Sequence, residues 1–198
     1  MIKFPLPIRK AIDIFSQFPG IGAKTAERLV FYLLKQHPDF INQFEKSLAE
    51  IKRDINECKI CFNYCFGDLC DICEDSRRDK KVICIIEEPK DIIAFEKIGY
   101  MGSYHVLGGV ISPLDGIDPD DLNINSLMSR LDNVNEIIIA TNTSIEGDAT
   151  ALYIRKILLD KTVKISRLAR GLPVGGNLDF IDEATLSQSV KERIEIKE

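Results

Sequence analysis

The chain has 198 residues, enough for one sizeable domain or two small ones. Its hydrophobic content of 45% and charged content of 29% are typical of a soluble globular protein, and no apolar run approaches the ~20 residues that a transmembrane helix needs. The first residues, Met1 to Pro5, lack the apolar segment and cleavage site of a signal peptide. We therefore expect a cytoplasmic protein that has no membrane contacts.

The net charge of −5 excludes a protein that is basic as a whole, but the charge is unevenly distributed. Residues 1–57 carry nine Lys/Arg and seven Asp/Glu, whereas residues 58–198 carry 17 Lys/Arg and 24 Asp/Glu. A polyanion would therefore meet the N-terminal part, and the acidic remainder suits a basic protein partner.

Helices are predicted throughout the N-terminal part. Residues 8–17 are predicted to form the first helix, and residues 18–22 form a turn that neither a helix nor a strand would tolerate. Apolar residues at helical spacing predict a second helix from Ala23 to about Gln36. A third amphipathic helix, which ends at the first cysteine, is predicted from the spacing of Phe44, Leu48, Ile51 and Ile55.

The turn before the second helix has the composition of an anion site. Gly20 and Gly22 permit unusual backbone angles and leave the amides uncovered, and the helix that follows presents its positive end. Lys24 and Arg28 are four residues apart, so they share a helical face and reach neighbouring phosphates. The pattern resembles the helix-hairpin-helix motif, which contacts the DNA backbone without reading sequence. The alternative is a helical hairpin whose glycine turn serves only packing or dimerisation.

Two Cys-x-x-Cys pairs with eight residues between them follow the helices. Two such knuckles complete a tetrahedron around one ion, which predicts a structural zinc site with the ligands Cys58, Cys61, Cys70 and Cys73. A disulfide framework is the alternative, but such frameworks belong to small secreted chains, and a redox pair does not account for two adjacent units. Cys65 fits the ligand spacing less well, and Cys84 lies in an apolar run that predicts a buried side chain.

After the cysteines the pattern changes to alternating strands and helices. Continuous apolar runs predict buried strands, and the alternation predicts a parallel sheet with crossover helices. The predicted strands are residues 82–86, 104–107, 136–140 and 163–168. The predicted helices are residues 91–98, 118–131, 148–159 and 183–193.

Carboxylates gather where two of the predicted strands end. Glu87 follows the first strand, and Glu146 and Asp148 follow the third, at the edge where open α/β sheets carry their functional groups. The pattern resembles the Toprim domain, whose enzymes hold Mg²⁺ with a first Glu and an Asp-x-Asp. Here Asn142 and Ser144 occupy the Asp-x-Asp positions, which predicts weak metal binding and a protein-docking surface. The alternatives are solvated strand-end residues without a role and an active Mg²⁺-dependent Toprim nuclease or primase-like enzyme.

Three further glycine-rich stretches carry a resemblance that covers nearly the whole chain. Together with the hairpin, the cysteines and the Toprim-like sheet, residues 104–109 (YHVLGG), 112–116 (SPLDG) and 171–176 (GLPVGG) resemble the bacterial RecR family of recombination proteins. The expected organisation is mixed α/β and comprises a helix-hairpin-helix region, a four-cysteine zinc finger, a parallel Toprim-like sheet and a short helical tail that is an oligomerisation or swap element. Their expected ranges are 1–57, 58–73, 80–175 and 176–198.

The resemblance implies a non-enzymatic protein of recombinational DNA repair. RecR-like proteins assemble from dimers into a tetrameric ring around DNA, act with RecO and RecF at single-strand gaps, and help to load RecA. It implies DNA binding by Gly20, Gly22, Lys24 and Arg28, and one structural Zn²⁺ on the four paired cysteines. It further implies RecO docking at Glu87, Glu146 and Asp148, Glu146 foremost, and a location at the bacterial nucleoid.

Overall fold

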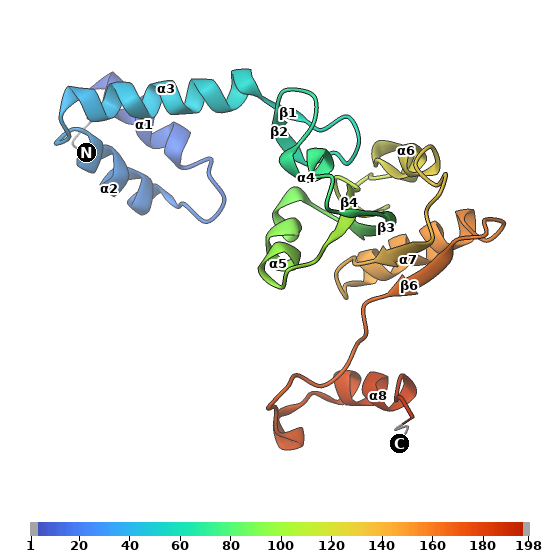
Figure 1. The fold of residues 1–198 in the computed structure, drawn as a ribbon. Helices are drawn as coiled ribbons and strands as arrows, with labels where there is room; N and C mark the ends of the chain where they lie inside the picture. Colours follow the sequence, from blue (N-terminus) through green and yellow to red (C-terminus); the bar gives the residue numbers. More distant parts are fainter. Residues whose placement is uncertain (1–3, 196–198) are drawn as a thin grey trace. The chain divides into compact units, whose positions relative to one another are not determined.

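The computed structural model describes residues 4–195. The chain forms two compact units, the first ending at Ile55 and the second beginning at Asn56. The four paired cysteines therefore belong to the same unit as the sheet, and each unit is described by itself (Figure 1).

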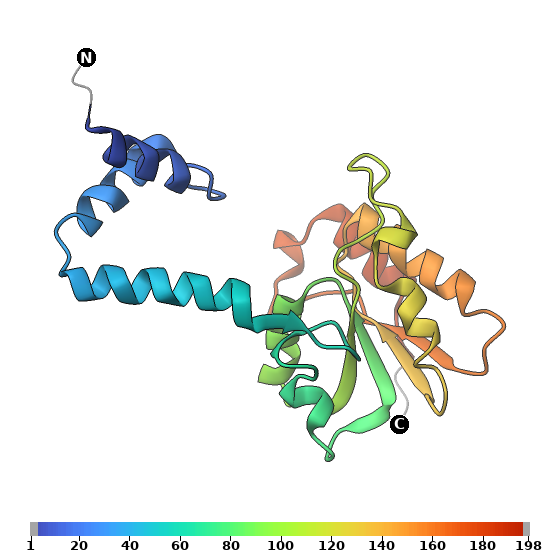
Figure 2. The ribbon, with the colours of Figure 1, turned by 90° about the horizontal axis from the view of Figure 1, so that it is seen from above.

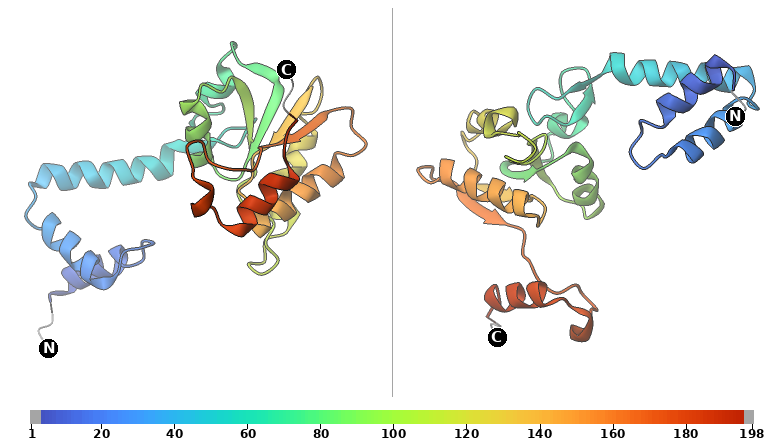
Figure 3. Two further views of the ribbon diagram at one scale, coloured as in Figure 1. Left: turned by 90° about the horizontal axis from the view of Figure 1, so that it is seen from below. Right: turned by 180° about the vertical axis from the view of Figure 1, so that it is seen from behind.

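The first unit consists of three helices. α1 spans Leu6–Phe15, α2 spans Ala23–Leu33 and α3 spans Pro38–Asp54. α1 and α2 pack side by side as a helical hairpin (Figure 3), and among the described residues of this unit only Ala26 and Val30 are buried apolar residues. α1 begins two residues before the predicted start because Pro7 occupies its first turn, where proline is tolerated.

α3 begins earlier than its apolar spacing indicates. His37 caps it by accepting the amide of Asp39 at 3.4 Å, and Pro38 is compatible with the first helical position. The apolar residues that predicted this helix remain exposed along it, with side-chain exposures between 39% and 58%: Phe44, Leu48, Ile51 and the adjoining Ile55. Among the described residues of the first unit, one face of α3 is therefore apolar and exposed.

The second unit opens with three short elements that were not predicted. β1 (Ile55–Glu57) pairs with β2 (Tyr64–Phe66), and the single-turn helix α4 spans Asp71–Glu74. Each element has only three or four residues, which is too few for a hydrophobic period to appear in the sequence.

A four-stranded parallel sheet forms the centre of the second unit (Figure 2). Its strands are β3 (Asp79–Ile86), β4 (Gly102–Val106), β5 (Glu136–Ile139) and β6 (Lys164–Arg167), in the order β4-β3-β5-β6. The prediction of a parallel α/β sheet is confirmed, and each predicted strand is present with ends that differ by at most three residues.

The two faces of the sheet carry separate apolar cores because side chains alternate along β3. Ile83 and Ile85 point to the face covered by α6 (Ile124–Met128) and α7 (Ile145–Ile157). Cys84 and Ile86 point to the opposite face, where they pack with α5 (Ile92–Lys97). Cys84 is fully buried there, as predicted.

The prediction of one helix over residues 118–131 is wrong. The segment forms a 3₁₀ turn, η2 (Pro119–Asp121), and then the short helix α6. Asp118 and Asp121 form a capping box, so their side chains bond to the backbone locally in place of a continuing helix. Leu122 is extended and separates the two pieces.

The remaining elements are short turns and the C-terminal helix. η1 spans Pro89–Asp91, η3 spans Leu178–Phe180 and α8 spans Glu183–Lys191. Within residues 4–195, no helix is both long enough and apolar enough to span a bilayer.

Candidate functional site

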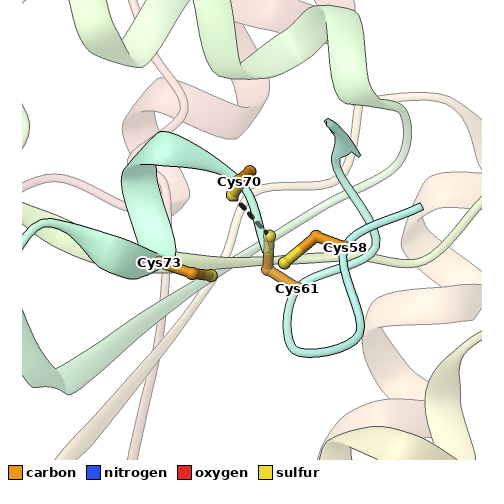
Figure 4. Close-up of side chains that lie close together, drawn as sticks. All are labelled: Cys58, Cys61, Cys70 and Cys73. Atoms are coloured by element: carbon orange, nitrogen blue, oxygen red, sulfur yellow. Dashed lines mark hydrogen bonds between the residues drawn. The ribbon is translucent and has the colours of Figure 1, made fainter. Parts of the chain in front are cut away.

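The four paired cysteines converge on one point. The loop after β1 carries Cys58 and Cys61, and α4 with its preceding residue carries Cys73 and Cys70 (Figure 4). All four sulfur atoms lie within 4.8 Å of one another, and the Sγ atoms of Cys61 and Cys70 are 3.4 Å apart. The sequence prediction that these residues gather is confirmed.

The donor set fits a tetrahedral ion such as zinc. A regular tetrahedron with metal–sulfur distances of about 2.3 Å places its sulfur atoms about 3.8 Å apart, close to the spacing of these thiols. All four residues are at most 8% exposed. Cys65 does not join them, because its Sγ donates to the carbonyl of Gly67 at 3.4 Å and it is absent from the sulfur cluster.

The electrostatics of the cluster favour a bound cation. Hydrogen bonds to Cys70 and Cys73, together with burial, raise the pKa of the Cys61 thiol, whereas the same bond from Cys61 lowers the pKa of Cys70. Four thiolates at this spacing repel one another in a buried place. A divalent cation removes that repulsion, so metal binding and formation of the knuckle are coupled.

The knuckle is fastened to the edge of the sheet. The amide of Val106, the last residue of β4, donates to the carbonyl of Cys61 at 2.8 Å. The ring of Phe62 meets the ring of His105 edge-on, with centroids 5.4 Å apart. The knuckle therefore covers strand β4, which would otherwise be an open sheet edge.

The hairpin turn in the first unit leaves the start of α2 uncovered. Gly20 has φ +77°, a left-handed conformation that favours glycine, and the amide of Ile21 closes the turn on the carbonyl of Phe18 at 3.0 Å. Gly22 is the N-cap residue and offers no side-chain cap. Within the described residues, the amides of Ala23 and Lys24 have no acceptor.

Two cations accompany these free amides. Lys24 and Arg28 are both exposed, lie one turn apart on α2, and have no ion pair among residues 4–195. Helix N-termini with free amides attract anions, and flanking cations strengthen the attraction. The geometry at this turn suits a phosphate.

At the carboxyl edge of the sheet, Glu87 is buried and bound by an amide. Its two carboxylate oxygens accept the backbone amide of Asn142 at 2.6 Å and the side-chain amide of Asn142 at 2.5 Å. Ser144 is engaged as well, because its hydroxyl caps α7 by accepting the amide of Gly147 at 3.0 Å. The two residues at the Asp-x-Asp positions therefore serve the local structure.

Gly147 is required by this close packing. A Cβ atom at that position would lie 2.2 Å from the carbonyl oxygen of Asn142 and 3.1 Å from a carboxylate oxygen of Glu87. Any side chain would push α7 away from the strand end.

Asp148 is engaged by two arginines, one at the end of β6 and one just after it. Arg167 donates to its carboxylate at 2.5 Å, and Arg170 donates to both of its oxygens. The guanidinium of Arg170, assisted by that of Arg167, lowers the pKa of Asp148 to about 2. These arginines were missed, because nothing in the sequence indicates that residues so far from Asp148 contact it.

Glu146 differs from the other two predicted docking residues. It is half-buried, and within residues 4–195 its carboxylate has neither an ion pair nor a hydrogen bond. Glu87 is 9% exposed and Asp148 is held by arginines, so Glu146 is the carboxylate of this edge that remains free to meet a partner.

The edge does not assemble the ligand set of a Toprim metal site. Among residues 4–195, the four cysteines form the one group of three or more metal-capable side chains that lie close together. Asn142 contacts Glu87 there, so an amide stands where a second carboxylate would.

Comparison with known families finds three matches along the chain. Residues 81–169 match the Toprim domain, residues 8–52 match the RecR helix-hairpin-helix and residues 171–194 match the RecR C-terminal region. The fold and the site thus define a protein in which a helix-hairpin-helix and a four-cysteine knuckle precede a Toprim sheet. The three matches together show that the chain belongs to the RecR family.

Proposed function

We propose that this protein is a non-enzymatic recombination mediator that binds DNA without sequence preference. Membership of the RecR family supports a role in recombinational repair. The observation that carries the DNA contact is the start of α2, where free amides, Lys24 and Arg28 face solvent together. The proposed place of action is a single-strand gap on the bacterial chromosome in the cytoplasm.

The contact made by one hairpin is weak and depends on salt, so we propose that the protein acts as a homo-oligomer, a dimer that forms a tetrameric ring. Repeating a weak phosphate contact around a ring raises its avidity. The uncovered apolar face of α3 supports association of the first units, because exposed apolar patches of this kind mark protein contacts.

We propose Zn²⁺ as the resident ion of the four cysteines, one per chain. The support is the all-thiolate donor set, its near-tetrahedral spacing and its burial. Bound there, the ion would supply no chemistry; it would neutralise the thiolates and hold the knuckle against β4.

We propose that RecO docks at the carboxyl edge of the sheet through Glu146. The resulting complex would act with RecF and help to load RecA. The free carboxylate of Glu146 beside the exposed Ile145 supports a contact with a basic and apolar surface. Glu87 and Asp148 would support this surface from behind, because their carboxylates are already occupied.

The second candidate function is a Mg²⁺-dependent Toprim nuclease or primase-like enzyme. It is favoured by the position of Glu87 at a strand end and opposed by the amide of Asn142 bound to it. Incubation with labelled gapped DNA and Mg²⁺ separates the two. Cleavage or synthesis that Glu87→Ala abolishes would establish the enzyme and overturn the mediator.

DNA binding is tested by titrating gapped DNA at several salt concentrations. The binding constant K falls as salt rises. Loss of one phosphate contact makes the slope of log K against log[salt] less steep by about one unit per binding chain. Lys24→Ala should reduce its steepness in this way, whereas Lys46→Ala on exposed α3, where Lys46 pairs with Glu50, should not. No affinity at low salt, with native mass spectrometry showing an intact oligomer, would refute the DNA contact.

RecO docking is tested separately by Glu146→Lys. This substitution should abolish capture of RecO and leave zinc content and DNA binding unchanged. If Glu146→Lys still captures RecO, the docking surface lies elsewhere on the molecule.

A further inference from the structure

Arg130 connects the segment between α6 and β5 to strand β4. Its Nη1 donates to the carbonyl of Tyr104 at 2.7 Å and lies 2.9 Å from Nδ1 of His105. Because Nε2 of His105 lies 2.7 Å from the carbonyl of Asn123, we assign the ring proton to Nε2, so that Nδ1 accepts from the guanidinium. One edge of the guanidinium is thereby fixed to β4.

Arg130 also lines a cavity to which residues of the knuckle contribute. Within residues 4–195, Nε and Nη2 of Arg130 make no hydrogen bond, and neither is a buried unpaired atom. Arg130 and Cys73 both line a cavity of about 250 Å³, together with Ile60 and Ile72 of the knuckle. Arg130 therefore lines the same cavity as one of the predicted metal ligands, and two of its donors have no partner among the described residues.

Within residues 4–195, no carboxylate forms an ion pair with this cation, although Asp132 lines the same cavity. The neighbouring Arg78 is paired with Glu96 at 2.5 Å, but the described part of the chain gives Arg130 no ion pair. A half-buried cation without a counter-charge is costly. Burial lowers the pKa of Arg130, and the thiolates of the four cysteines oppose that shift. A divalent ion with four thiolates would carry a net charge of −2, and one of its ligands, Cys73, lines the same cavity as Arg130.

We propose that Arg130 is a positioning residue and the counter-charge of the four-cysteine metal centre. Its free edge partly neutralises the thiolates across the cavity, and its fixed edge holds β4 at Tyr104. Because the next residue but one, Val106, bonds to Cys61, the same short segment of β4 joins the guanidinium and the knuckle. This inference rests on the proposed metal site. Outer-shell partners of metal ligands affect metal affinity by about 10- to 100-fold.

The first test compares zinc release from the full-length protein to a chromophoric chelator. We expect Arg130→Gln to release zinc about tenfold faster or more, and Arg130→Lys to remain within about threefold of the parent. Lys80→Gln is the matched control, since Lys80 lines the same cavity, and it should behave as the parent. Equal release rates for the parent and a folded Arg130→Gln would overturn the proposal. If that variant does not fold, zinc release from Arg130→Lys that is tenfold or more faster than from the parent has the same consequence.

The second test reads the charge directly in Co²⁺-loaded protein. A nearby cation stabilises thiolate lone pairs, so its loss should move the thiolate-to-metal charge-transfer band of Arg130→Gln to longer wavelength, while tetrahedral d–d bands stay in place. An unmoved band would overturn the counter-charge role even if stability changed. A parent protein that contains no metal would instead refute the metal site itself, so the two failures are distinguishable.

Discussion

Both carboxylate oxygens of Glu87 accept hydrogen bonds from Asn142, one from its backbone amide and one from its side-chain amide. A Toprim enzyme has the first Asp of its Asp-x-Asp at the position of Asn142. There, that Asp and the Glu at the position of Glu87 would bind one cation together. Here the amide supplies the positive end of a dipole, so the buried Glu87 is satisfied by the chain itself. Arg167 and Arg170 do the same for Asp148.

Asn142→Asp should therefore destabilise the protein at neutral pH. The substitution removes a donor and sets two carboxylates against each other, which we expect to lower the free energy of unfolding by about 1–3 kcal/mol. Urea unfolding at pH 7.5 measures this. Asn125→Asp is the control, because Asn125 also donates to a carboxylate, but its partner Asp120 is exposed whereas Glu87 is buried. It should cost less than about 1 kcal/mol. Equal stability of Asn142→Asp and the parent would contradict the role given to Asn142.

A glycine substitution tests the hairpin turn. Gly20 has φ +77° and no atom within 4 Å of a Cβ built on it, so Gly20→Ala adds conformational strain without a clash. We expect a loss of about 1 kcal/mol in stability and weaker DNA binding. Gly22→Ser, at φ −81° and with equal space, should cost no stability, because serine is a favoured N-cap residue. Equal effects in circular-dichroism melts of the two variants would show that the left-handed turn does not matter.

The ligand set is tested by comparing two cysteines of the knuckle. Cys70→Ser should abolish the single zinc per chain and behave in thermal melts as the chelated parent does, because three thiolates leave the tetrahedron open. Cys65→Ser should retain the zinc, since the Cys65 sulfur bonds to Gly67 and lies outside the cluster. Zinc content by mass spectrometry decides, and zinc lost from both variants would require a different ligand set.

Much of this architecture could be predicted because its signals are local. The cysteine spacing is set by the geometry of a knuckle, and the apolar runs of β3 and β5 follow from burial on both faces. The prediction of a single helix over residues 118–131 was wrong because the apolar residues have helical spacing there, but the capping box between Asp118 and Asp121 favours a short 3₁₀ turn.

The contacts that complete the candidate site depend on tertiary packing. Arg170 reaches Asp148 across 22 residues, and Arg130 reaches His105 across 25. No short-range pattern encodes such pairs, so the sequence placed Asp148 at the correct edge but missed the arginines that occupy it.

The last prediction concerns pH and the buried His105. Burial is the main cause that lowers its pKa from 6.5 to about 4, with the charge of Arg130 adding to it. Between pH 6.5 and pH 4, His105 therefore binds a proton in the unfolded chain but not in the folded chain. The free energy of unfolding consequently falls as the pH drops from about 7 toward 4.

By linkage, the free energy of unfolding should fall by about 2 kcal/mol between pH 7.5 and pH 5 through this residue alone. Denaturant unfolding at both pH values measures the fall, and the parent-minus-variant difference removes contributions that both proteins share, including thiol protonation at the knuckle. In His105→Gln the free energy of unfolding should no longer show this part of its fall between pH 7.5 and pH 5. Substitution of the exposed His37 by Gln should leave the fall unchanged. The same pH dependence in His105→Gln as in the parent would mean that the His105 ring is not held neutral against β4.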